Sequence, residues 1–227
     1  MALLQPYDII IDCTDNVPAR YLLSDTAVRL GRPLVSGAAQ KYEGQLCIYN
    51  LGDSGPCYRC IFPKPPAPEM SGSCEELGIL GAVTGVIGVM QALETVKILT
   101  GLHGVYDAFD TRFSERQVIS TDGKATLMLF SALSMPPFRS IKLRERKPTC
   151  AACGVDGQRL GAIHETDYIA FCGGLRPDWE ARGLVSGSPG ARISAQVRRS
   201  TLRCKEQSQL LPGVTKKTGI AGTMRVA

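Results

Sequence analysis

Histidine and tryptophan are scarce in this sequence of 227 residues, which contains two histidines and one tryptophan. His103 and His164 stand apart from other possible ligands, so a site built on histidine is not expected. The first six residues, MALLQP, have neither the basic region nor the apolar run of an export signal. Because nine cysteines accompany this absence, we expect a reducing compartment, the cytosol, in which the cysteines are used as thiols.

The sequence also lacks an uninterrupted apolar run of about 20 residues, the length that spans a membrane. Its most apolar stretch, 77–93, is interrupted by glycines and has no basic flanks. We therefore predict a buried helix packed closely on a sheet, with its glycines allowing the close approach, and no membrane partner. The alternative is a membrane span in which Gly81 and Gly85 form a helix-packing face.

Positive charge is concentrated in the C-terminal part of the chain. Residues 173–227 contain ten basic and three acidic side chains, although the whole chain has a net charge of only +5. No aromatic cluster or nucleic-acid motif accompanies this charge, so direct binding of nucleic acid is not expected. Apolar periodicity fades beyond Val155, and 155–227 is predicted to be a linker followed by a disordered basic tail.

Two matched cysteine pairs are the strongest chemical signal. The motif CYRC occupies 57–60 and the motif CAAC occupies 150–153, with turn residues beside each pair. Two residues between ligands let one tight turn direct both sulfurs at a single ion. Four thiolates leave no open coordination position, so we predict a structural Zn²⁺ site. Its ligands are Cys57, Cys60, Cys150 and Cys153.

Alternating strand and helix patterns predict an α/β fold. A β-branched run at 7–12 is followed by a helix that extends to Leu30 and ends at Gly31, and a second strand follows at 33–37. This βαβ unit places the first two strands in parallel. Later strands are expected at 45–50, 125–130 and 138–143, with an exposed loop at 62–76 and an unpatterned insertion at 101–124.

Four motifs follow one another in an order typical of a known family: DCTDN at 12–16, CYRC at 57–60, QALE at 91–94 and CAAC at 150–153. Together they resemble the E1-like adenylyltransferases of the MoeB/ThiF family. The run DYIAFCG at 167–173 is similar to the eukaryotic branch that combines adenylyltransferase and sulfurtransferase. The resemblance implies that 1–154 is the C-terminal half of a Rossmann-like E1/ThiF adenylation domain with a zinc site formed by four cysteines.

The resemblance also implies an activity: ATP-dependent adenylation of the C-terminal glycine of a ubiquitin-like sulfur carrier ending in Gly-Gly, then sulfur transfer. The pathways implied are molybdenum cofactor biosynthesis and tRNA thiolation, carried out by a homodimer. Asp15 and Asn16 match the pair that contacts ATP and Mg²⁺, although by position they could serve only to cap a helix. Cys74 matches the mobile-loop cysteine that forms a thioester with the substrate.

Two departures from the family pattern bear on activity. The family's first strand with its glycine-rich phosphate turn is missing from this sequence, and no rhodanese pattern follows Gly174. We therefore expect this chain alone to be inactive or weak. The alternative is a non-catalytic, zinc-stabilised module that binds a ubiquitin-like protein or a full-length protomer.

Overall fold

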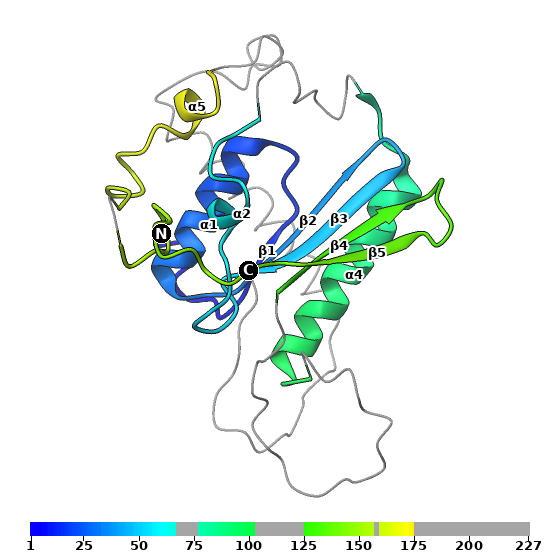
Figure 1. Ribbon diagram of the computed structural model, residues 1–227, viewed down its shortest axis with the longest axis horizontal. Helices are drawn as coiled ribbons and strands as arrows, with labels where there is room; N and C mark the ends of the chain where they lie inside the picture. Colours follow the sequence, from blue (N-terminus) through cyan, green and yellow to red (C-terminus); the bar gives the residue numbers. More distant parts are fainter. Residues whose placement is uncertain (67–76, 103–124, 157–158, 175–227) are drawn as a thin grey trace, which may run out of the picture.

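The computed structural model describes residues 1–66, 77–102, 125–156 and 159–174, which form a mixed five-stranded sheet with a helix on each face (Figure 1). The strands lie side by side in chain order, and only the first pair is parallel. Antiparallel pairing continues through the remaining strands. The α/β class predicted from the sequence is confirmed. The strands are β1 (Ile10–Asp12), β2 (Leu34–Gln40), β3 (Glu43–Tyr49), β4 (Thr126–Ser131) and β5 (Phe138–Lys142).

Helix α1 (Val17–Leu30) makes the crossover between the two parallel strands. Asn16 begins it as the N-cap, because its Oδ1 accepts a hydrogen bond from the Ala19 backbone N–H at 2.9 Å. Gly31 ends it with φ = 63°, a left-handed conformation that glycine adopts without strain. The predicted βαβ unit and both ends of its helix are therefore confirmed.

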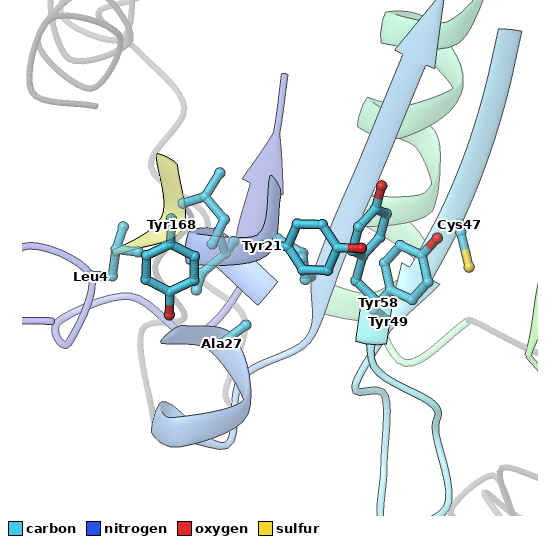
Figure 2. Close-up of a cluster of buried hydrophobic side chains, with 10 residues drawn as sticks. Leu4, Tyr21, Ala27, Cys47, Tyr49, Tyr58 and Tyr168 are labelled. Carbon is cyan, nitrogen blue, oxygen red and sulfur yellow. The ribbon is translucent and has the colours of Figure 1, made fainter. Parts of the chain in front are cut away.

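Side chains that alternate along β2 supply two separate cores. Leu34 packs with tyrosines on the α1 side, whereas the next residue, Val35, packs on the side of α4 (Gly81–Leu99). Figure 2 shows the first of these clusters, with Tyr21, Tyr58 and Tyr49 close together between α1 and the sheet. Both faces of the sheet are thus covered at its parallel edge, whereas all residues of β5 at the other edge are exposed.

Helix α4 packs against β2 and β3, but not in the predicted way. Adding a Cβ at Gly81, Gly85 or Gly88 would meet nothing within 4 Å, so these glycines do not allow a close approach. The prediction was wrong on this point, because the glycines that allow the close approach of α4 lie on the strands, at Gly37 and Gly44.

The same helix is long and apolar enough to cross a membrane, and it alone meets that criterion among the described residues. Core helices of α/β domains pass the same test. Only Val83, Ile87, Gln91 and Thr95 are buried, on the face that contacts β2 and β3. The predicted buried helix is therefore confirmed on that face alone, because Val89, Leu93 and Val96 are exposed.

Two short helices complete the described chain: α2 (Tyr58–Ile61), within the first cysteine pair, and α5 (Tyr168–Phe171), which the sequence analysis did not predict. Residues 67–76 of the predicted loop, 103–124 of the insertion and 175–227 of the predicted tail lie outside the described residues. The boundary at residue 154 and the disorder of the tail stay predictions.

Candidate functional site

A cavity of about 560 Å³ opens where the parallel strands β1 and β2 end. The turn between β1 and α1 forms one wall, with Cys13, Asp15 and Asn16 among its lining residues. In open α/β sheets, ligands bind beyond the carboxyl ends of the strands. The two residues predicted to contact a nucleotide therefore lie in a cavity at the expected edge of the sheet.

The turn at 12–16 is held in place by a buried network centred on Asp12. Its Oδ1 accepts hydrogen bonds from the backbone and hydroxyl of Thr14 at 2.9 and 2.6 Å, and its Oδ2 accepts one from Ser36 at 2.8 Å. Arg20 closes the network: it lies 3.4 Å from Asp12 Oδ2 and donates to the carbonyls of Thr14 and Gly37 at 2.6 and 2.9 Å. The cavity wall is thereby tied to both parallel strands.

Asn16 has two roles in this geometry. Its side-chain oxygen caps α1, while its Nδ2 donates to Asp15 Oδ1 at 3.3 Å on the cavity wall. Capping and cavity lining are therefore compatible. A carboxylate at the start of a helix is also favoured by the helix dipole. Contact of either residue with a nucleotide stays a prediction.

Gln91 on α4 supports the cavity from the other face of the sheet. Its Nε2 donates to the backbone carbonyls of Asp12 at 2.8 Å and Val35 at 3.2 Å, and Cys13 Sγ lies 3.8 Å from its Oε1. No role was predicted for this residue from the sequence. A polar amide within an otherwise apolar helix was the available signal, because a buried amide needs hydrogen-bond partners.

The four predicted metal ligands come together around α2. Their sulfurs all lie within 4.8 Å of one another, and all four residues are buried. Individual separations are 3.8 Å for Cys57–Cys60, 3.6 Å for Cys57–Cys150 and 3.3 Å for Cys60–Cys153. A tetrahedron with metal–sulfur bonds of about 2.3 Å has sulfur–sulfur edges of about 3.8 Å. The four cysteines could therefore hold one metal ion.

Contacts outside the cysteines align the two pairs. Arg146 donates to Asn50 Oδ1 at 3.0 Å, and its backbone N–H donates to the Ser54 carbonyl at 2.9 Å. A Cβ on Gly55 would collide with the Leu51 backbone, and one on Gly154 with the Pro148 carbonyl, so both turns need glycine. The chain before Cys150 is thus fastened beside the first pair by hydrogen bonds that do not involve the thiols.

The four thiols share their protons through hydrogen bonds. These contacts lower the pKa of Cys150 and raise the pKa of Cys57 and Cys153. The Lys147 backbone N–H also donates to Cys60 Sγ at 3.4 Å, as outer groups commonly do at thiolate sites. A bound cation would have to displace the remaining thiol protons, because thiolates are the form that binds a metal.

Cys74 lies outside the described residues. The nearest described cavity residues on either side of it in the chain are Pro66 and Ile79, and both line the cavity. Gly78 and Leu80 fix the second flank through backbone hydrogen bonds to Lys41, at 3.0 and 2.9 Å. The segment that contains Cys74 therefore leaves and re-enters the described structure at the cavity.

Comparisons with known proteins give consistent results. The model of the ThiF family matches residues 1–152. The adenylyltransferase and sulfurtransferase MOCS3 of Bos taurus is 44% identical over 192 residues, which is 85% of this chain and 37% of that protein. The adenylyltransferase and sulfurtransferase uba4 of Aspergillus terreus is 47% identical over 189 residues, covering 78% of this chain and 35% of that protein.

The chain thus spans little more than a third of the curated relatives it matches. Among solved structures, the crystal structure of MccB from E. coli with succinimide aligns with a TM-score of 0.43 at 15% identity. That alignment covers 65% of this chain and 39% of MccB.

Proposed function

Because the chain belongs to the ThiF family, we propose that it contributes to ATP-dependent adenylation of the C-terminal glycine of a ubiquitin-like sulfur carrier, followed by sulfur transfer. The observation that carries the proposal is the cavity at the ends of β1 and β2, lined by Asp15 and Asn16. Its relatives named adenylyltransferase and sulfurtransferase support the same activity. The pathways proposed are molybdenum cofactor biosynthesis and tRNA thiolation, in the cytosol.

The first chemical step would give a poor electrophile a good leaving group. An oxygen of the substrate's terminal carboxylate attacks the α-phosphorus of ATP, the bond to pyrophosphate breaks, and an acyl-adenylate forms. Asp15 would supply a carboxylate oxygen, the type of ligand that Mg²⁺ prefers. The network around Asp12 and Arg20 would hold Asp15 in position during this step.

Cys74 is proposed as the acyl acceptor in the second step. Its thiolate would attack the acyl carbon, AMP would leave, and a thioester would remain. Cys74 is five residues from Ile79, which lines the cavity, and five residues span at most about 18 Å. Because Ile79 and Asp15 line the same cavity, the proposal needs the Cys74 thiol to reach across that cavity and no further.

We propose that the ion held by the four cysteines is a structural Zn²⁺. Three of the six sulfur separations are 3.3 to 3.8 Å and all lie within 4.8 Å, which supports tetrahedral thiolate coordination, and the burial of all four ligands leaves no position for a substrate. Elemental analysis of purified protein should give one zinc per chain. Substoichiometric metal, or another metal in its place, would contradict the assignment.

The partners proposed are a ubiquitin-like sulfur carrier ending in Gly-Gly and a second copy of the chain. Val89, Leu93 and Val96 of α4 are each about half or more exposed, which supports an apolar contact surface between protomers. Sedimentation analysis of the purified chain would test the dimer, and a monomer at micromolar concentration would contradict it.

Two measurements on the 227-residue chain test the activity: ATP–pyrophosphate exchange, and binding of a Gly-Gly-ending carrier with and without ATP and Mg²⁺. We expect weak exchange that Asp15→Asn reduces by at least about tenfold, and tighter carrier binding when nucleotide is present. Asp53→Asn, in an exposed turn away from the cavity, is the matched control.

The outcomes separate the two hypotheses. If the affinity for the carrier were the same with and without nucleotide, and in Asp15→Asn, the non-catalytic binding module would be favoured over the enzyme. An ATP–pyrophosphate exchange rate of about 1 s⁻¹, within the usual range of enzyme turnover, would show instead that the chain alone is not impaired.

A further inference from the structure

Tyr58 connects the metal centre with the cavity. It lies between the ligand candidates Cys57 and Cys60, begins α2, and is also one of the residues that line the cavity. Its side chain is only 8% exposed. Tyr58 is therefore held in place at the metal centre while it faces the cavity.

The ring of Tyr58 is held on several sides. Figure 2 shows it between Tyr21 and Tyr49, whose ring centroids lie 5.0 and 5.6 Å away in edge-to-face geometry. Phe62 packs against the same ring at 4.8 Å, and the Tyr58 backbone N–H donates to Ser24 Oγ at 3.2 Å. The hydroxyl of Tyr58 therefore has a nearly fixed position before any ligand arrives.

That hydroxyl has no hydrogen-bond acceptor among the residues that the structure describes. The other tyrosines of this core differ: Tyr21 donates to the Phe62 carbonyl at 2.8 Å, and Tyr168 donates to Asp25 at 2.9 Å. Tyr58 is mostly buried but lines the cavity, so its hydroxyl is available to donate a hydrogen bond to a ligand there.

The surroundings indicate which acceptor it would meet. Arg20, which is paired with Asp12, and Arg139 line the same cavity and supply positive charge there. A peptide with a free C-terminal carboxylate, which the proposed function requires, offers such an acceptor.

We propose that the Tyr58 hydroxyl donates a hydrogen bond to the terminal carboxylate of the substrate and so orients it for attack on ATP. This inference rests on the proposed function and adds to it a substrate-binding residue. It also gives the metal centre a second role, because the cysteines on either side of Tyr58 determine where its hydroxyl lies.

The test is an NMR titration of the chain with a synthetic ten-residue peptide ending in Gly-Gly, as the free acid and as the C-terminal amide. Tyr58→Phe removes the hydroxyl and keeps the ring, and we expect it to weaken binding of the free acid about tenfold, as for a hydrogen bond to a charged group. Binding of the amide, which has no carboxylate, should change less than about twofold. Tyr7→Phe, outside the cavity, is the control, and unchanged metal content verifies the fold of each variant.

Each result bears on a different claim. Equal affinity of the free acid for the unaltered chain and for Tyr58→Phe would overturn the role of Tyr58 and leave the proposed function standing. Failure of the unaltered chain to bind either peptide or an intact Gly-Gly-ending carrier would contradict the proposed function itself. A tenfold loss of affinity for both peptides in Tyr58→Phe would show that the hydroxyl contacts something other than the carboxylate, and would also overturn the inference.

Discussion

Arg59 donates from Nε and Nη2 to the two carboxylate oxygens of Asp25, at 2.9 Å each, in a bidentate pair that joins the first cysteine turn to α1. Both side chains are almost fully buried, at 4% and 1% exposed. Tyr168 adds a third hydrogen bond to Asp25, and the guanidinium lies 4.5 Å from the ring centre of Phe171. One ion pair thus connects the metal centre, α1 and α5.

Arg59→Met should destabilise the fold by about 3–5 kcal/mol, because it leaves the Asp25 carboxylate buried without its charged partner. Burial raises the pKa of Asp25, and its contacts with Arg59 counter that effect. Losing Arg59 should therefore raise this pKa further. A raised folded-state pKa means that stability falls as pH rises through it, so the cost of the variant should be larger at pH 8 than at pH 5. Urea unfolding at the two pH values measures both effects.

The ion pair of Arg32 and Asp8 is the control for Arg59→Met. Its Nη1 and Oδ1 atoms lie 3.5 Å apart, and its side chains are 38% and 33% exposed. Arg32→Ala should cost about 1 kcal/mol or less. Replacing both buried partners, with Arg59→Met and Asp25→Leu together, should recover much of the loss because no charge is left buried. If the single and double variants were equally unstable, the uncompensated carboxylate would not be the cause.

Removal of the metal should unfold the part of the chain that the two cysteine pairs join. Structural zinc contributes on the order of 10–16 kcal/mol in small domains, which is as large as the total stability of an ordinary domain. Cys57→Ala and Cys150→Ala should therefore lose both the metal and the cooperative unfolding transition. Circular dichroism and elemental analysis before and after chelation measure the two together.

Cys74→Ala is the matched control for these cysteine substitutions, because the proposed role of Cys74 is chemical and not structural. It should keep one metal per chain and an unchanged melting temperature. An unfolded Cys74→Ala variant would contradict its assignment as an acyl acceptor on a loop. A stable Cys150→Ala variant without metal would show that the contacts of Arg146 and Asn50 suffice to hold the two turns together.

The sequence was sufficient for features that depend on local chemistry. The strand and helix pattern from Ile10 to Gly31 follows from apolar periodicity, a capping asparagine and a glycine stop, and the paired cysteines followed from ligand spacing. Helix α5 has a local N-cap at Asp167, but it was missed because a single turn shows no apolar periodicity and its Tyr168 is held by a hydrogen bond to Asp25, 143 positions away. The role of Gln91 was missed for the same reason, since its acceptors are backbone groups on two distant strands.

Thiol labelling should follow exposure and pKa. Cys13 is exposed on the cavity wall, whereas burial raises the pKa of Cys172 to about 11 and that of Cys47 to about 12. With metal bound at pH 8, iodoacetamide should therefore modify Cys13 well before the other two. A thiol with a pKa of about 11 is roughly one part in a thousand thiolate at pH 8, so labelling of Cys172 should rise about tenfold at pH 9. Mass spectrometry of tryptic peptides resolves the sites.

Protection of Cys13 provides a second use of the same measurement. A Gly-Gly-ending peptide that occupies the cavity should slow alkylation of Cys13, which lines it, and leave Cys172 unaffected. Cys172 does not line the cavity and acts as the internal control. Equal slowing at both cysteines would indicate a general change in stability, and no slowing at Cys13 at saturating peptide would place the peptide elsewhere.

The glycines on the strands and those on α4 should respond oppositely to alanine. A Cβ on Gly44 would lie 2.5 Å from Ile87 Cγ1, and one on Gly37 would lie 2.8 Å from Ile87 Cγ2, so neither strand position has room for a methyl group. Gly44→Ala should therefore destabilise the fold by about 1–3 kcal/mol through overpacking. Gly85→Ala meets nothing within 4 Å in the middle of a helix and should stabilise it by about 0.5–1 kcal/mol. Guanidinium unfolding of the two variants measures whether each substitution raises or lowers the free energy of unfolding. If Gly85→Ala destabilised the fold instead, α4 would pack through its glycines, as in a membrane helix pair or a tight contact between protomers. Its placement against β2 and β3 through Ile87 would then be wrong.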